Sequence, residues 1–324
     1  MATDKNKHLE CVLSSHKVSK EQSLLDKHSE RKIEIKEAME QEYGDRMYSP
    51  FLSGSFAKNT AVNSKFDFDL MTPFKRNAFG STGTLKEMYE NVFNFLYEKY
   101  INEATVRKQK VSIGIEFYPD KDGHVVKIDV VPGRELNLNQ YKDDNKVNLY
   151  VYEQFGNISQ GSDYILSNIQ AQIKNIRDRA TAEKDSIRKS IRLLKVWKIG
   201  RGYGPKSFFL ELITIKAFDS ETITGNTWDK LKKVMEYIRD NVKTVPLPDP
   251  GNSGNDVAET LTAYDKTLLS DDMKLMLERI EENSDNIKSY YQINEKHPCE
   301  EEKTDNKYGV KKDEVSTPPV TRFG

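Results

Sequence analysis

The sequence is poor in cysteine and histidine, and it contains no long apolar run. Two cysteines, Cys11 and Cys299, among 324 residues are too few for a disulfide framework or a zinc cluster. The five histidines are scattered without the spacing of metal ligands. The richest apolar run, residues 208–218, is interrupted by Glu211 and Lys216, so it is far shorter than the roughly 20 apolar residues that span a membrane. The first residues also lack the apolar core of a secretory signal. We therefore expect no membrane span and a reducing, cytoplasmic location.

Charge is balanced over the whole chain but not along it. The sequence has 50 Lys plus Arg against 51 Asp plus Glu, which argues against a protein that coats nucleic acid. Residues 174–206, however, contain eleven basic and three acidic residues, a net charge of +8. Such a stretch can bind triphosphates or a nucleic-acid backbone, although solvated helix faces also collect charges. With 16 Tyr and 14 Phe available for a core, wholesale disorder is excluded.

The first half of the chain alternates between helical and strand patterns. Residues 19–42 are rich in Lys, Glu and Leu, contain no Gly or Pro, and stop before Gly44, which is typical of one long helix. Alternating apolar residues indicate strands farther on, and a turn at 119–123 joins two of them. The expected elements are a helix at 19–42, a strand at 65–71, a helix at 85–100 and hairpin strands at 111–117 and 124–131.

The second half has helical periodicity over residues 164–293, interrupted by a Pro-rich loop at 245–251. From residue 295 on, the chain has no periodicity and the composition of a mobile tail. We predict an α+β fold in three parts: a mixed domain at 1–160 that includes the long helix, a helical domain at 161–295 and a flexible tail at 296–324.

Two aspartates on one predicted strand are the first candidates for chemistry. Asp67 and Asp69 are two residues apart, so both carboxylates leave the same sheet face, while Phe66, Phe68 and Leu70 point to the opposite, apolar face. Carboxylates held side by side repel each other and persist most easily where divalent cations balance them. Mg²⁺ suits such a site because it prefers carboxylate and phosphate oxygens. An edge strand with two ordinary surface acids is the alternative.

Other residues support the metal interpretation. Gly54 and Ser55 precede the pair and offer a backbone and a hydroxyl that can approach phosphates closely. Asp129 lies in an otherwise apolar predicted strand, where a lone acid needs a partner. Three carboxylates can hold two Mg²⁺ ions roughly 3.5 to 4 Å apart, the template for phosphoryl-type transfer.

The motifs around these residues resemble those of a known family. Gly-Ser-Phe-Ala-Lys-Asn-Thr-Ala at 54–61, Asp-Phe-Asp at 67–69 and Ile-Asp-Val-Val-Pro at 128–132 look like the signature of the polymerase-beta-like nucleotidyltransferases. Among them, the chain most resembles the bacterial cGAS/DncV-like nucleotidyltransferases (CD-NTases), relatives of cyclic GMP-AMP synthase and oligoadenylate synthetase. Residues 191–198 and 205–214 are similar to helical-domain motifs of oligoadenylate synthetase. Residues 249–257 resemble its Asp-Pro to Asn-Asn-Val loop, with Asp256 in place of the second Asn.

The resemblance implies a role for each matching residue. Asp67, Asp69 and Asp129 would be catalytic residues and ligands of two Mg²⁺ ions, with Mn²⁺ as a substitute and Asp129 near the attacking hydroxyl. Gly54 and Ser55 would hold the terminal phosphates of the donor nucleotide. Lys195 and Ser207 match positions that contact the triphosphate, and Phe208 matches an aromatic residue that stacks on a nucleobase, with Phe in place of the usual Tyr. From the helical wheel alone, either Lys195 or Lys198 can reach the phosphates; we favour Lys195.

The resemblance also implies a fold and an activity. A polymerase-beta-like sheet domain and a helical domain would bind ATP, GTP or both in the cleft between them and release pyrophosphate. The product would be a cyclic di- or trinucleotide second messenger, read by a downstream effector in CBASS antiphage signalling. A linear oligonucleotide synthetase uses the same catalytic residues. An RNA-tailing nucleotidyltransferase, with the basic stretch on RNA, and a catalytically silent binding module are further alternatives.

Two features bear on partners. The zinc insertion of the animal DNA sensors has no counterpart in this sequence, so we do not expect DNA recognition in their manner, and a nucleic-acid activator stays open. The sequence ends in Gly324 after a Pro-containing segment. In some bacterial antiphage operons, a similar C-terminal glycine is conjugated by an E1/E2-like ancillary protein; a plain flexible tail is the alternative.

Overall fold

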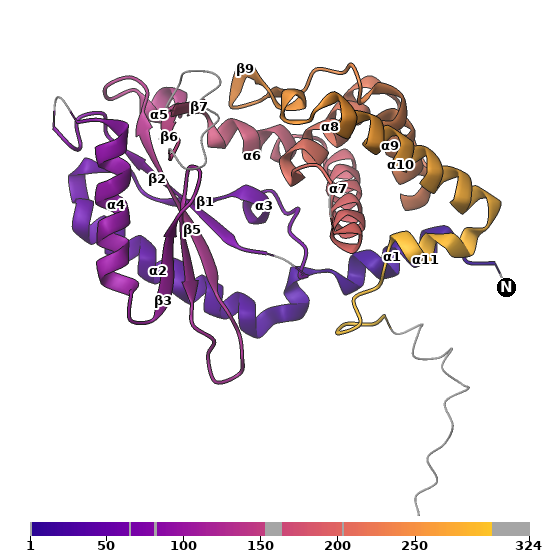
Figure 1. The fold of residues 1–324 in the computed structure, drawn as a ribbon, viewed down its shortest axis with the longest axis horizontal. Helices are drawn as coiled ribbons and strands as arrows, with labels where there is room; N and C mark the ends of the chain where they lie inside the picture. The colour runs from indigo at the N-terminus through magenta and orange to yellow at the C-terminus, as the bar shows by residue number, and fades with distance from the viewer. Residues whose placement is uncertain (1, 65, 81–82, 153–163, 203, 300–324) are drawn as a thin grey trace, which may run out of the picture.

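The computed structural model describes residues 2–64, 66–80, 83–152, 164–202 and 204–299 (Figure 1). The first group of elements is α1 (Lys5–Ser15), α2 (Gln22–Tyr43), β1 (Phe51–Ser53), α3 (Gly54–Ala57), β2 (Phe68–Phe74), α4 (Leu85–Tyr100), β3 (Ala104–Lys108), β4 (Ile113–Phe117), β5 (Lys127–Glu135), α5 (Tyr141–Asp144), β6 (Val147–Tyr150) and β7 (Tyr164–Ser167). The second group is α6 (Ile169–Arg177), α7 (Thr181–Arg201), α8 (Ser207–Ser220), α9 (Thr227–Asn241), β8 (Pro248–Asp249), β9 (Asn252–Asp256), α10 (Ala263–Glu282) and α11 (Ile287–Tyr290).

Seven strands form one mixed sheet, with α2 and α4 packed against it (Figure 1). Its order is β1-β2-β5-β4-β3, and β6 pairs with both β5 and β7. β2 and β5 run parallel, whereas the other pairs are antiparallel. The β2–β5 register sets Asp69 beside Asp129. Two candidate residues that are distant in sequence therefore meet at one level of the sheet.

Local sequence explains the elements that hold the sheet. α4 begins at a capping box in which Thr84 and Glu87 exchange side-chain and backbone hydrogen bonds. Its Met88, Val92 and Leu96 are fully buried in a core that also contains Phe68 and Leu70 of β2. The helix predicted at 85–100 has the bounds of α4, and the predicted hairpin corresponds to β4 and β5.

The structure differs from the predicted elements in several places; among them, the strand predicted at 65–71 is β2 at Phe68–Phe74, and β1 and the β8–β9 hairpin were not predicted. The long helix is α2, but a separate helix, α1, precedes it and packs through Leu9, Val12 and Leu13 into the core of the helical half. Residues 164–167 were expected to be helical and instead form β7, which pairs with β6 at the sheet. β3 and β6 were not predicted. Strands of four or five residues carry too little periodicity to be told from helix or loop.

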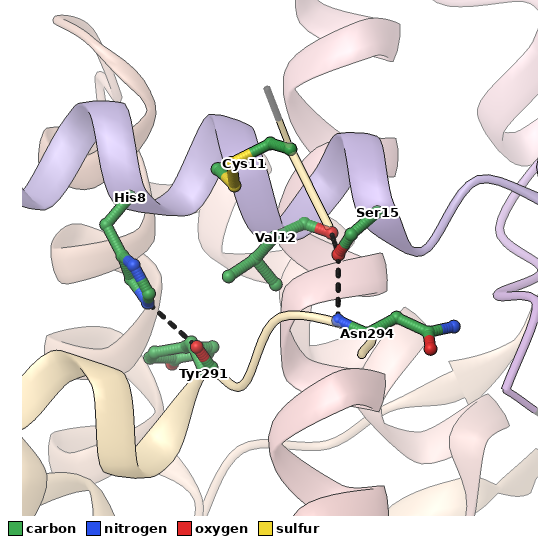
Figure 2. Close-up of a disulfide and its surroundings, with 7 residues drawn as sticks. His8, Cys11, Val12, Ser15, Tyr291 and Asn294 are labelled. Atoms are coloured by element: carbon green, nitrogen blue, oxygen red, sulfur yellow. Dashed lines mark hydrogen bonds between the residues drawn. A yellow bond between two sulfur atoms is a disulfide. The ribbon is translucent and has the colours of Figure 1, made fainter. Parts of the chain in front are cut away.

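The two cysteines, too few for a disulfide framework, form a single disulfide, which the expected reducing location did not predict (Figure 2). Cys11 of α1 and Cys299 have Cα atoms 5.7 Å apart although 288 positions separate them in sequence. The chain after α11 runs along α1, where the His8 ring nitrogen hydrogen-bonds to the Tyr291 carbonyl (2.8 Å) and Asn294 N donates to Ser15 Oγ (3.1 Å). This packing of the two ends of the chain, which no local pattern reports, brings the sulfur atoms together.

No described helix is both long and apolar enough to cross a membrane. The expected connection near residue 160 and the C-terminal Gly324 lie outside the described residues.

Candidate active site

Three aspartates gather on one face of the sheet. Asp69 of β2 and Asp129 of β5 are register partners, and Asp67 immediately precedes β2. Burial, followed by the charges of Asp67 and Asp129, raises the pKa of Asp69 to about 7. Burial and the charge of Asp67 likewise raise the pKa of Asp129 to about 6. The apolar neighbours Phe68 and Leu70 are buried in the core, as the alternation predicts.

The charge of this cluster is poorly compensated. Among the described residues, no hydrogen-bond donor reaches the carboxylate of Asp67 or Asp69. By contrast, the buried carboxylate of Glu135 accepts hydrogen bonds from the Tyr48 hydroxyl and from several backbone amides. Carboxylates left without donors in a partly buried site favour cations, and an all-oxygen donor set suits Mg²⁺ or Mn²⁺. The three aspartates thus fit a divalent metal.

Ligand geometry also distinguishes this cluster from a second acidic group. The oxygens of the three aspartates do not all lie within 4.8 Å of one another, whereas ligand atoms of Asp120, Asp122 and His124 do. The Lys27 ammonium occupies that second group: it pairs with Asp120, donates to Asp122 at 3.1 Å and lies 2.9 Å from His124 Nδ1. The positive charge of Lys27 therefore already occupies the position where a metal ion would bind.

Gly54 allows the backbone to approach the aspartates. Its φ is +60°, and a Cβ at this position would lie 1.7 Å from Asp69 Oδ2. α3 begins at Gly54, and the chain returns through a hydrogen bond from Thr60 N to the Ser55 carbonyl (2.9 Å). A residue with a side chain would displace the Asp69 carboxylate, so the requirement for glycine inferred from the motif has a steric cause.

Lysine side chains tie this loop, residues 54–60, to the helical half. Lys195 of α7 is buried, and its Nζ donates to Thr60 O (2.8 Å) and Oγ1 (3.1 Å). Burial lowers the pKa of Lys195 to about 8, and the nearby Lys58 charge adds to the effect. Lys58 Nζ donates to Glu211 Oε1 of α8 at 2.6 Å, with both side chains almost fully buried. The loop is therefore fixed from two neighbouring helices.

A cleft of about 450 Å³ lies between the sheet and the helices. Of the eight predicted site residues, five line it: Ser55, Asp67, Asp69, Lys195 and Ser207. Other lining residues are Ala61, Val62, Lys198, Ile199 and Gly202. Gly54 and Asp129 are not among them but adjoin Asp69, Gly54 by its close steric approach and Asp129 as the register partner on β5.

Phe208 has the surroundings of a core residue. It packs against the helical core and does not line the cleft. Lys58 Nζ lies 4.9 Å from the centroid of its ring. Its ring is therefore in contact with protein atoms, and the predicted stacking of Phe208 on a nucleobase stays a prediction.

Two residues that matter to the site were not predicted. Lys58 stands inside the loop motif, and Glu211 interrupts an apolar run; the structure pairs them. An acid within an apolar helix was the available signal for Glu211, since such a group needs a buried partner. Neither the identity of that partner nor its distance of 153 positions along the chain could be read from the sequence.

The loop motif at 249–257 has a structural role. It forms the β8–β9 hairpin, in which buried Asp249 accepts hydrogen bonds from Gln172 Nε2 (3.0 Å) and Gly251 N (2.7 Å). Asp256 accepts from Leu247 N and Ala258 N. These contacts explain the acids of the motif without a ligand.

Comparison with known proteins bears on the fold. No protein-family model matches the sequence, and a search of curated proteins found no match. Among solved structures, CdnC of E. coli MS115-1 with ATP is similar at 19% identity over 89% of this chain and 96% of that one, with a TM-score of 0.67. The CdnE cyclic dinucleotide synthase of Elizabethkingia meningoseptica, with GTP and Apcpp, has 16% identity, coverage of 77% and 96%, and a TM-score of 0.54.

A third similar structure is the Vibrio cholerae DncV cyclic AMP-GMP synthase in complex with the linear intermediate 5′ pppA(3′,5′)pG. It has 15% identity, coverage of 78% of this chain and 70% of that one, and a TM-score of 0.60. All three are bacterial CD-NTases. The chain therefore has the polymerase-beta-like fold of the CD-NTases, and the predicted α+β fold class is confirmed.

Proposed function

We propose that this chain is a nucleotidyltransferase that condenses nucleoside triphosphates and releases pyrophosphate. One observation carries the proposal: Asp67 and Asp69 line one cleft together with Ser55 and the buried Lys195, and Asp129 adjoins Asp69 on the next strand, on the fold of known cyclic dinucleotide synthases. An anionic cluster beside cationic and hydroxyl groups suits a metal-bound triphosphate. A similar fold alone would not be sufficient, because folds host many functions.

Asp67, Asp69 and Asp129 would hold two Mg²⁺ or Mn²⁺ ions, which supply charge neutralisation for the phosphates and activation of the attacking hydroxyl. The chain itself would supply the remaining functions. Gly54 would leave its backbone uncovered by a side chain beside Asp69, and Ser55 Oγ and Ser207 Oγ would offer hydroxyl donors to the cleft.

The two lysines on the helical side would bind phosphate. Lys195 and Lys198 both line the cleft, on α7. Lys195 already donates to Thr60, so we assign it the dual role of holding the loop and facing the donor phosphates. By the family resemblance, Asp129 would lie near the attacking ribose hydroxyl and assist its deprotonation.

We further propose a cyclic di- or trinucleotide product made from ATP, GTP or both, acting as a second messenger for an effector in CBASS antiphage defence. The solved relatives that bind ATP or GTP, and the linear intermediate bound to DncV, support this choice. A linear oligonucleotide synthetase with the same residues is the first alternative. The cytoplasmic location stays a prediction, because the Cys11–Cys299 disulfide is not typical of a reducing compartment. Conjugation of Gly324 by an E1/E2-like protein stays a prediction.

The test is incubation of the purified chain with Mg²⁺ or Mn²⁺ and every combination of ATP, GTP, CTP and UTP, with and without RNA. Pyrophosphate release and mass spectrometry after phosphatase treatment identify the reaction and the product. We expect a phosphatase-resistant cyclic product from the wild type and none from Asp67→Ala with Asp69→Ala or from Gly54→Ala. Asp120→Ala with Asp122→Ala, an Asp-x-Asp pair outside the cleft, is the matched control and should retain activity.

Several outcomes would change the proposal. Linear products would favour the oligonucleotide synthetase, and extension of labelled RNA would favour the tailing enzyme. Unchanged pyrophosphate release from the Asp67/Asp69 double variant would rule out the site.

A further inference from the structure

A glutamine outside the predicted motifs holds one of the three carboxylates. Gln109 follows β3, and its Nε2 donates to Asp129 Oδ1 at 3.1 Å. Among the described residues it is the one side chain that hydrogen-bonds to this carboxylate. The contact leaves the second oxygen of Asp129 without a donor from the described chain.

The orientation of the Gln109 amide is fixed by its neighbour in the turn. Ser112 Oγ donates to Gln109 Oε1 at 2.7 Å. An amide oxygen can only accept and an amide nitrogen can only donate, so this bond directs Nε2 toward Asp129. Ser112 is itself buried, which keeps its hydroxyl from exchanging this partner for water.

The Tyr89 side chain of α4 holds the backbone of the turn at residues 109–112 by hydrogen bonds. The hydroxyl of Tyr89, a fully buried side chain, lies 3.0 Å from the Gln109 carbonyl and 2.8 Å from the Ser112 carbonyl, and it accepts a hydrogen bond from Gln109 N at 3.1 Å. Gln109 N also donates to Ser112 O at 2.9 Å. The side chain therefore projects from a rigid turn, and little conformational entropy remains to be lost when it binds Asp129.

Space for the amide is provided by a glycine. Gly114 of β4 is the register partner of Asp129, and a Cβ there would lie 2.4 Å from Gln109 Nε2 and 3.2 Å from Asp129 Oδ1. Any side chain at this position would push the amide away. Tyr89, Ser112 and Gly114 thus converge on one contact, from Gln109 to Asp129.

We propose that Gln109 is a positioning residue for nucleotidyl transfer, holding Asp129 by one oxygen so that the other is presented to the metal and the attacking hydroxyl. The inference rests on the proposed function and deepens it. A neutral donor is suited to this task, because a Lys or Arg making the same bond would place a positive charge where a cation must bind. Gln109 adds orientation without reducing the negative charge of the cluster.

The test compares Gln109→Leu with Gln109→Glu. Loss of an outer partner of a metal ligand typically costs about 10- to 100-fold in metal affinity or activity. We expect Gln109→Leu to lower kcat by that factor and to weaken Mn²⁺ binding, measured by calorimetry on nucleotide-free protein, by about 10-fold. KM for the triphosphate should change little, since the residues lining the cleft are untouched.

Gln109→Glu separates positioning from mere packing. Glutamate has the shape of glutamine, so a role limited to filling space predicts that it is the milder substitution. A positioning role predicts the reverse for kcat, because the new carboxylate repels Asp129. Ser112→Ala frees the amide to rotate, and Gly114→Ala pushes it away from Asp129. Each variant should therefore lower kcat although Gln109 itself is unchanged.

Gln172→Leu is the matched control. Gln172 makes the same amide-to-aspartate contact with buried Asp249, away from the cleft. We expect it to lower thermal stability and to leave kcat and Mn²⁺ affinity unchanged. A wild type inactive with every triphosphate would contradict the proposed function, and the Mn²⁺ measurement would still test the contact. An active wild type whose kcat and Mn²⁺ affinity survive Gln109→Leu would overturn the positioning role alone.

Discussion

The buried ion pair between Lys58 and Glu211 should be the main electrostatic link between the candidate loop and the helical half. The nitrogen-oxygen distance is 2.6 Å, and the two side chains are 6% and 5% exposed. Removing one partner of such a pair leaves an uncompensated buried charge and typically costs about 3–5 kcal/mol. Replacing both partners by apolar residues of similar volume is often neutral. We therefore expect Lys58→Met or Glu211→Met to destabilise the protein by about 3–5 kcal/mol, and the double variant to lie within about 1 kcal/mol of the wild type.

Urea unfolding of the wild type, both single variants and the double variant measures this coupling. The free energies form a double-mutant cycle whose interaction term isolates the pair. Equal m-values across the four proteins are needed, since a changed slope reports a changed unfolding reaction. Lys216→Met removes a lysine from α8, the helix that carries Glu211. It is a control for the loss of a positive charge from that helix and should have a small effect. Single variants that cost less than about 1 kcal/mol, or a double variant that costs their sum, would refute the reasoning.

Two further predictions concern pH and the disulfide. In protein freed of metal, the raised pKa values of Asp69 (about 7) and Asp129 (about 6) mean that the folded state holds these protons more tightly than the unfolded chain. The free energy of unfolding should then decline as pH rises from about 4 to about 7. In urea unfolding at a series of pH values, Asp69→Asn should flatten that decline. An equally steep decline in the variant would contradict the raised pKa of Asp69. Reducing the Cys11–Cys299 bond should lower the free energy of unfolding by about 2–4 kcal/mol and expose residues 291–299 to proteolysis. Identical stability with and without reductant would argue against the bond.

The parts of the fold that could be predicted from sequence are those fixed by local geometry. The alternation of Phe68 and Leu70 with Asp67 and Asp69 sets two faces of a strand, and the structure buries one face in the core. The helix at 85–100 has strong periodicity and a capping box at its start, so its bounds were predictable. Gly54 was identified from its motif, and the steric reason lies in the 1.7 Å that a Cβ would leave to Asp69 Oδ2.

The parts that could not be predicted depend on packing between distant segments. Val147, Leu149 and Val151 alternate, yet without its neighbours β5 and β7 the strand β6 is too short to identify. Two cysteines give no information on whether the segments that carry them meet. Gln109 is one polar residue near a turn in sequence, and its contact with Asp129 depends on pairing β3 to β4 and β4 to β5.

The chain contains the Asp-x-Asp pattern at both 67–69 and 120–122, and their contrast shows what decides between a site and an ordinary surface. Pro119 and Gly123 flank the second pair, which predicts a turn, and in the structure Lys27 supplies the positive charge that the pair requires. The first pair is flanked by aromatic residues that fix it to a core strand. The nearby Lys58 and Lys195 donate to Glu211 and Thr60, so neither hydrogen-bonds to the carboxylates of this pair. The hydrogen-bond partners of nearby lysines, rather than carboxylate spacing, therefore decide which of the two Asp-x-Asp pairs is the candidate metal site.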